Sequence, residues 1–174
     1  GMHVDLPYVG MEDIESNTGR FIGSLSLREM KSSTFLFSSK HVLYGRLRPY
    51  LNKVMIPDFD GHCSSEIFPI LPNELVLQKY LQYWLLMDST VSMIDATSTG
   101  TRMPRANMNQ LLEFSIPVPP LDEQERIVRI FDEALRNFNQ MKQNLQKESA
   151  SYDELKQCIL QEAFTGKLTG GIAA

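Results

Sequence analysis

The sequence predicts an α+β protein in which a small domain with a mixed sheet is followed by one long C-terminal coiled-coil helix. Three observations lead to this prediction. Short β-prone runs separated by turn residues occupy residues 6–71, and a strongly apolar helical segment follows them. After a proline-rich arm, apolar residues then recur at alternating spacings of four and three. We therefore expect two domains, residues 1–118 and residues 119–174.

The β-prone runs are short and rich in Val, Ile, Phe and Tyr, as is typical of strands. We expect strands at residues 6–10, 34–37, 42–44, 53–56 and 66–71. The turn-forming sequence Ser-Ser-Lys-His separates residues 34–37 from residues 42–44, so these two strands are expected to pair. Residues 57–61 are expected to form a turn. Pro69 lies inside the last run and favours an edge position or a bulge, because proline lacks a backbone donor.

Helical segments follow the strands. Residues 73–87 are apolar on nearly all sides, which predicts a buried helix. A short apolar piece at residues 91–94 precedes a loop of small polar residues, 96–102. Residues 107–112 are expected to form one or two helical turns, and residues 113–116 a returning strand.

A proline arm separates the two expected domains. Pro117, Pro119 and Pro120 remove backbone donors and favour extended neighbours, so no helix is expected to run back through them. Asp122 is the expected N-cap of the next helix. Glu125 stands three residues further on, as in a capping box, and the acidic first turn suits the helix dipole.

The long helix carries a heptad seam. Its apolar positions are Ile127, Phe131, Ala134, Phe138, Met141, Leu145, Tyr152, Leu155 and Ile159. A repeat of 3.5 residues keeps such a stripe facing one partner helix, as in a coiled coil. Glu148 interrupts the seam and residues 149–151 are weak helix formers, which predicts a bend or a register change. Gly166 is the expected end of the helix.

The expected length of this helix requires a partner. About 43 residues at about 1.5 Å each give a rod of about 65 Å. A domain of about 120 residues is too small to cover the apolar stripe of such a rod. The second helix must come from another chain or from another part of a longer chain. The alternative is one long core helix within a larger bundle.

Composition narrows the function classes. The formal net charge is −4, which argues against a protein that coats nucleic acid non-specifically. The N-terminal residues are polar and no window approaches 18 apolar residues, so we expect a cytoplasmic protein that is neither exported nor membrane-bound. Cys63 and Cys158 are expected to be reduced thiols.

No catalytic site, cofactor or metal site is expected. Neither glycine-containing loop has the spacing of a phosphate-binding loop. His62, Cys63 and Asp60 stand close together, but no second Cys/His pair lies at zinc spacing. Asp58, Asp60 and Glu66 lack the nearby lysine of a nuclease centre, so a solvated turn is the favoured interpretation.

Two acid-free basic runs predict a local nucleic-acid contact on this acidic chain. The first extends from residue 40 to residue 53, and the second from residue 96 to residue 112. In an extended segment, alternate residues from 44 to 50 share one face. The candidate contacts are Lys40, Tyr44, Arg46, Arg48, Tyr50, Lys53, Thr99, Thr101, Arg102 and Arg105. For residues 44–50, the alternative is a solvated strand face with an internal salt bridge. For the loop of the second run, the alternative is a common threonine-rich loop without a binding role.

Several motifs together resemble the specificity subunits of type I restriction-modification systems. They are Leu-Pro-Tyr-Val-Gly from residue 6, His-Val-Leu-Tyr-Gly-Arg-Leu-Arg-Pro-Tyr-Leu from residue 41, Tyr-Leu-Gln-Tyr-Trp-Leu from residue 80, and Ser-Thr-Gly-Thr-Arg from residue 98. The most specific are Ile-Pro-Val-Pro-Pro-Leu-Asp-Glu-Gln-Glu-Arg-Ile-Val from residue 116 and Leu-Gln-Glu-Ala-Phe-Thr-Gly-Lys-Leu from residue 160. The resemblance covers nearly the whole chain, in order.

The resemblance implies a target recognition domain that reads double-stranded DNA, followed by a conserved spacer helix. It implies docking to methyltransferase subunits and, through them, to a restriction subunit. Family members usually carry two such units with antiparallel spacer helices. One unit is present here, so we expect a half-subunit or fragment that pairs as a homodimer through antiparallel helices. The alternative is a coiled-coil interaction protein without a DNA role, such as a truncated decoy that binds the methyltransferase.

Overall fold

The structure is a computed structural model that describes residues 6–25 and 33–164. The chain divides into two compact units, residues 1–128 and residues 129–174. The expected boundary between residues 118 and 119 stays a prediction. No helix within the described residues is long and apolar enough to cross a membrane. The expected helix end at Gly166 lies outside the described residues.

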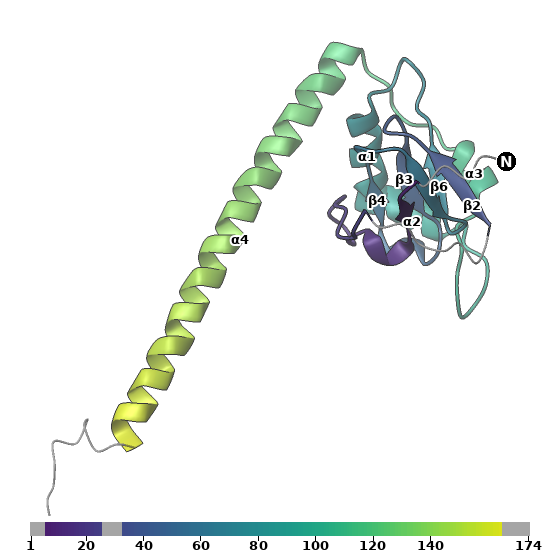
Figure 1. The fold of residues 1–174 in the computed structure, drawn as a ribbon. Helices are drawn as coiled ribbons and strands as arrows, with labels where there is room; N and C mark the ends of the chain where they lie inside the picture. The colour runs from purple at the N-terminus through teal and green to yellow at the C-terminus, as the bar shows by residue number, and fades with distance from the viewer. Residues whose placement is uncertain (1–5, 26–32, 165–174) are drawn as a thin grey trace, which may run out of the picture. The chain divides into compact units, whose positions relative to one another are not determined.

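Two three-stranded sheets form the centre of the first unit (Figure 1). The first sheet has the order β1 (Tyr8–Val9), β5 (Gly61–Ser64), β2 (Thr34–Phe37). It is mixed, because β5 pairs parallel with β1 and antiparallel with β2. The second sheet has the order β4 (Val54–Met55), β3 (Val42–Gly45), β6 (Ile67–Ile70) and is antiparallel.

The expected pairing of the strands at residues 34–37 and 42–44 is wrong. Both strands form, but they belong to different sheets. The strand that was not predicted is β5, which pairs with β2 along its whole length, from Gly61 to Ser64. Its sequence, Gly-His-Cys-Ser, carries no β-branched residue and no Phe, Tyr or Trp, so the usual strand signal is absent. The expected edge position of Pro69 is confirmed, since β6 is an edge strand.

The core lies on both sides of β3. Val42 and Tyr44 pack in one apolar cluster with α1 (Gln78–Leu86) and α2 (Asp88–Asp95). Leu43 points the other way, into a second cluster that contains Val9 and Cys63. Alternate side chains of a strand point to opposite faces, so β3 is buried on both. Because β3 is buried and ends at Gly45, it fixes the point at which the chain leaves the core, at Arg46.

The predictions for the segments that follow the sheets are partly confirmed and partly corrected. The buried helix begins at Gln78 instead of residue 73. Residues 107–112 do form a short helix, α3 (Met108–Leu112). Residues 113–116 are not a strand. This stretch leads into the proline arm, where the Tyr80 hydroxyl donates to the Pro117 carbonyl at 2.9 Å.

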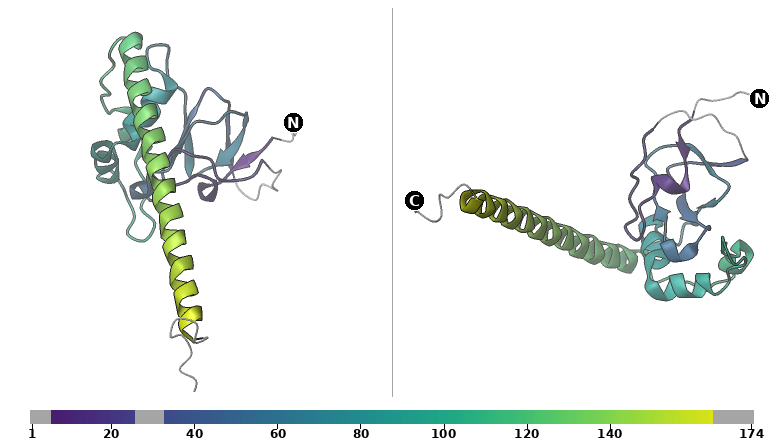
Figure 2. Two further views of the ribbon diagram at one scale, coloured as in Figure 1. Left: turned by 90° about the vertical axis from the view of Figure 1, so that its left-hand side faces the viewer. Right: turned by 90° about the horizontal axis from the view of Figure 1, so that it is seen from below.

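The long helix forms as one element, α4 (Leu121–Phe164), 44 residues long. It runs without a break or a sharp bend in Figures 1 and 2, so the expected bend near Glu148 is wrong. The alternative, a change of register in the coiled coil, stays a prediction. Ser151 donates its hydroxyl to the Lys147 carbonyl at 3.0 Å, a bond that the helical backbone accommodates. Asp122 lies inside the first turn and is not the N-cap.

Gln124 fixes the first turn of α4 to the body of the first unit. Its side chain is completely buried. The amide oxygen accepts from the Leu77 backbone N–H at 2.9 Å. The amide nitrogen donates to the carbonyls of Leu75 and Pro119, each at 2.8 Å. A glutamine at this position therefore satisfies three backbone groups that have been removed from water.

Candidate nucleic-acid interface

The fold brings the two basic runs together. Just after β3, the Arg46 carbonyl accepts from the Ala106 backbone N–H at 2.9 Å. Two residues later, the Arg48 backbone N–H donates to the Pro104 carbonyl at 2.7 Å. These bonds place the first run beside the second, although the bonded residues are 60 and 56 positions apart in the sequence. The candidate arginines thus lie on neighbouring segments of one surface.

The second basic run forms a closed loop. Thr99 and Arg105 pair through two backbone hydrogen bonds of 3.1 and 3.0 Å. Gly100 has a φ of 96°, a conformation that residues with a side chain rarely adopt. The tip of the loop, residues 101–103, is exposed. Its base is fixed by Thr97, whose hydroxyl accepts from the Asn107 N–H at 3.1 Å.

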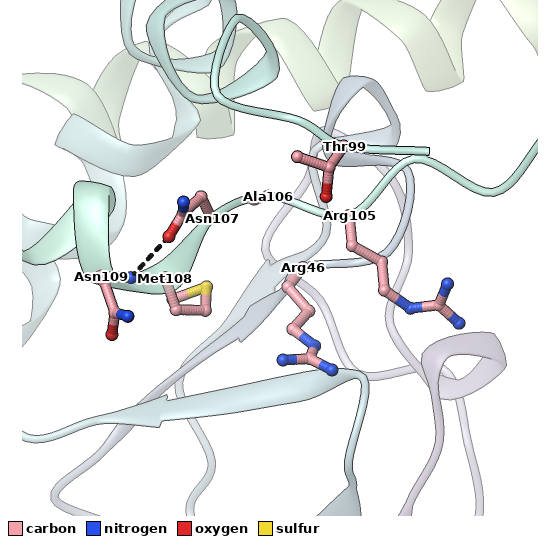
Figure 3. A pocket seen from close by; sticks show the side chains of 7 residues that line it. All are labelled: Arg46, Thr99, Arg105, Ala106, Asn107, Met108 and Asn109. Atoms are coloured by element: carbon pink, nitrogen blue, oxygen red, sulfur yellow. Dashed lines mark hydrogen bonds between the residues drawn. The ribbon is translucent and has the colours of Figure 1, made fainter. Parts of the chain in front are cut away.

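An open cleft of about 320 Å³ lies where the runs meet (Figure 3). It is lined by Arg46, Thr99, Arg105, Ala106, Asn107, Met108 and Asn109. The lining combines cationic donors, a hydroxyl and two amides. Such groups bond to phosphate oxygens and to base edges.

Glu66 joins the two arginines of this cleft. Its carboxylate accepts from Arg105 Nη2 at 2.6 Å and from Arg105 Nε at 2.9 and 3.0 Å. Arg46 Nε donates to the same carboxylate at 3.4 Å. The hydrogen bonds from Arg105, with the positive charges of both arginines, lower the pKa of Glu66, although partial burial opposes this shift. The internal salt bridge that was the alternative for residues 44–50 is therefore present at Arg46, and Arg105 of the second run shares it.

Asn107 is the N-cap of α3. Its side-chain oxygen accepts from the backbone N–H groups of Asn109 and Gln110 at 3.1 and 3.4 Å. Asn107, Asn109 and Glu66 were not predicted as residues of this site. Asparagine before a short helical segment is an N-cap signal that identifies Asn107. No local signal identifies Glu66, because its partners are distant in sequence.

The prediction that Tyr44 shares an exposed face with Arg46, Arg48 and Tyr50 is wrong. Tyr44 is 1% exposed and belongs to the core. Burial, reinforced by the negative charge of Asp95, raises the pKa of its hydroxyl. The strand ends at Gly45, and Arg48 has a φ of 52°, so the alternation expected of an extended chain does not continue.

The remaining candidates lie outside the cleft lining. Tyr50 is 52% exposed. Lys53 is half-buried and donates its ammonium to the Met11 carbonyl at 2.6 Å. Lys40 is exposed in the turn between β2 and β3. Thr101 and Arg102 are exposed at the tip of the loop. Contact of any of these residues with nucleic acid stays a prediction.

The ion pairs of Glu66 predict a loss of stability in acid. A carboxyl whose pKa is lower in the folded state stabilises the fold above its unfolded pKa, about 4.3, and this stabilisation is lost as the pH falls through the folded pKa. Glu66→Gln should therefore lower the melting temperature at pH 7 and flatten its decrease from pH 5 to pH 3. Thermal unfolding followed by circular dichroism measures both.

Glu74→Gln is the matched control, because Glu74 is exposed on the same unit. It should melt like the wild type at every pH. If Glu66→Gln shows the same dependence of melting temperature on pH as the wild type, the ion pairs do not contribute to stability.

A family model described as "Type I restriction modification DNA specificity domain" matches residues 2–148. Among characterised proteins, the chain is 33% identical over 158 residues to the type I restriction enzyme EcoDI specificity subunit of Escherichia coli. The match covers 90% of this chain and 35% of the relative. The chain thus spans about a third of the length of that protein.

Two solved structures share the fold. One, described as the structural basis underlying complex assembly and conformational transition of the type I R-M system, matches with a TM-score of 0.77 and 25% identity, over 91% of this chain and 43% of that chain. The other is the HsdS subunit from Thermoanaerobacter tengcongensis, with a TM-score of 0.72 and 25% identity, over 90% and 42% of the two chains. The match to both confirms the expected combination of an α+β domain and a long helix.

Proposed function

Because the chain belongs to the family of type I restriction modification DNA specificity domains, we propose that it recognises one half-site of a DNA sequence within a type I restriction-modification complex. The observation that carries this proposal is the meeting of two acid-free runs at one cleft. A cationic cleft on a chain of net charge −4 confines DNA affinity to one surface. Its arginines suit bidentate contact with guanine or phosphate.

The proposed contacts divide by position. Arg46, Thr99 and Arg105 line the cleft, together with Asn107 and Asn109. The exposed flanking contacts are Lys40, Arg48, Tyr50, Thr101 and Arg102, while half-buried Lys53 is the weakest candidate. Flanking cations suit phosphates, which position the duplex, whereas groups in the cleft suit base edges, which specify its sequence.

The chemistry of modification and cleavage is proposed to reside in partner subunits, so that this chain is a non-catalytic, cytoplasmic component. A relative of this chain is named as a specificity subunit of a restriction enzyme. By extension, we expect this chain to dock methyltransferase subunits through α4 and, through them, a restriction subunit.

The second unit supports pairing of α4 with another helix. From Glu133 to Glu162 every residue of α4 is exposed, including the heptad seam from Ala134 to Ile159. Phe138, Met141 and Leu145 are each more than 60% exposed. Burial of such side chains against a second helix is strongly favourable. Two antiparallel copies would form a two-fold dimer, and such a dimer reads an inverted repeat.

Selection from a randomised DNA duplex pool tests the proposed function. The full chain should enrich one short sequence motif, and a paired chain should enrich it as two inverted copies separated by a gap. Sequencing of the recovered pool measures the enrichment. A recovered pool with the same composition as the input would contradict DNA recognition. The exposed seam would then favour a coiled-coil interaction protein.

A further inference from the structure

The Arg105 guanidinium is held by one edge. Glu66 accepts from both Nε and Nη2, which lie along that edge. A guanidinium carries five N–H donors in one plane. The adjacent edge, formed by Nη1 and the second N–H of Nη2, can also make paired contacts with an external acceptor. Nη1 donates to the Met103 carbonyl at 3.4 Å, a long and exposed bond.

The backbone fixes all three members of this ion-pair cluster. The Arg46 N–H donates to the Glu66 carbonyl at 2.9 Å. Arg105 is held in the loop by its two bonds to Thr99. The Glu66 N–H donates to the Ser64 hydroxyl at 3.2 Å. The Glu66 side chain is 21% exposed, whereas Arg105 is 40% exposed. The carboxylate thus lies deeper than the arginine that it holds.

Glu66 also changes the charge of the surface. Two arginines around one carboxylate present one net positive charge instead of two. The attraction for phosphates, which every DNA sequence offers, is reduced by this carboxylate. A base edge with two acceptors, such as guanine O6 and N7, remains a good partner for an arginine in a fixed orientation. The same carboxylate therefore weakens non-specific contact and favours specific contact.

We propose that Glu66 is a specificity-determining positioning residue, which orients Arg105 for a guanine edge in duplex DNA and lowers the attraction of the cleft for phosphates. The inference rests on the proposed DNA-binding function. It predicts opposite effects of one substitution on two kinds of DNA, whereas a purely structural role predicts losses of the same sign.

The test compares Glu66→Gln with the wild type on two duplexes, the one recovered by selection and a scrambled duplex of equal composition. Fluorescence anisotropy titrations over a salt series measure both affinities. Glu66→Gln should bind the scrambled duplex more tightly, with a salt slope steeper by about one. It should bind the recovered duplex about tenfold more weakly. Glu74→Gln, which makes the same charge change at an exposed position of the same unit, should keep the wild-type ratio of the two affinities.

Arg105→Lys is the second variant, because it retains the charge but lacks the planar fork. It should lose affinity for the recovered duplex and keep affinity for the scrambled one. The inference is overturned if Glu66→Gln keeps the wild-type ratio of the two affinities. Tighter binding to both duplexes by the same factor would be such a result, and it would show that Glu66 merely competes with DNA for the arginines. A wild-type chain that does not discriminate between the duplexes overturns the proposed function itself.

Discussion

Replacement of Gln124 by alanine is expected to lower the free energy of unfolding of the first unit by roughly 3–5 kcal/mol. The side chain is fully buried and serves three backbone groups, those of Leu75, Leu77 and Pro119. Alanine removes the three bonds and leaves those groups without the amide that satisfied them. Urea unfolding followed by the fluorescence of Trp84, which belongs to α1 of the same unit, measures the change.

The matched control is Gln140→Ala, the same substitution at an exposed position of α4. It should change the free energy of unfolding by less than about 0.5 kcal/mol. Gln124→Glu adds a test of the assigned amide orientation. A carboxylate still accepts from the Leu77 N–H, but its second oxygen faces the Leu75 and Pro119 carbonyls, so this variant should be least stable where it is ionised. Equal unfolding midpoints for Gln124→Ala and Gln140→Ala would contradict the structural role of Gln124.

Charge in the seam of α4 is expected to abolish pairing. The full chain should scatter light as a dimer of about twice 19.9 kDa at tens of micromolar. The double variant Phe138→Glu, Leu145→Glu should scatter as a monomer. It removes four large apolar side chains from the paired helices, each worth about 1.5–3 kcal/mol when buried. The expected loss exceeds about 6 kcal/mol, or about four orders of magnitude in the dimer dissociation constant.

The control for pairing adds the same charge away from the seam. Gln140 and Gln143 lie on the side of α4 opposite Phe138, by the helical period of 3.6 residues. Gln140→Glu, Gln143→Glu should therefore remain dimeric. A wild-type chain that is monomeric throughout a concentration series would contradict pairing between copies. Equal masses for the two double variants would show that the seam is not the interface.

Local sequence patterns were sufficient for the elements that depend on local physics. The heptad repeat and the prolines before it predicted α4 to within one residue of its observed start. The β-prone run at residues 34–37 was predicted with the observed bounds of β2. The pairing partner of β2 could not be predicted from local sequence. That partner is β5, whose Gly-His-Cys-Ser sequence gives no strand signal.

The same distinction applies to the candidate site. The arginines were predictable, because acid-free basic runs are visible in the sequence. Glu66 was not, because its hydrogen bonds to Arg105 join residues 39 apart. The structural role of Gln124 was not predictable from local sequence either, since its bond to Leu77 spans 47 residues. Tyr44 was misplaced because the alternation rule assumes an extended chain, and β3 ends one residue later, at Gly45.

The most direct test of the proposed DNA surface is a titration of the selected duplex with the double variant Arg48→Ala, Arg102→Ala. Both arginines are exposed and lie on the two segments that meet beside the cleft. Lys147→Ala, which removes an exposed cation from α4, is the control. The double variant should bind at least about tenfold more weakly than the wild type, while the control should bind as the wild type does. An affinity of the double variant equal to that of Lys147→Ala would show that DNA is not bound at this surface.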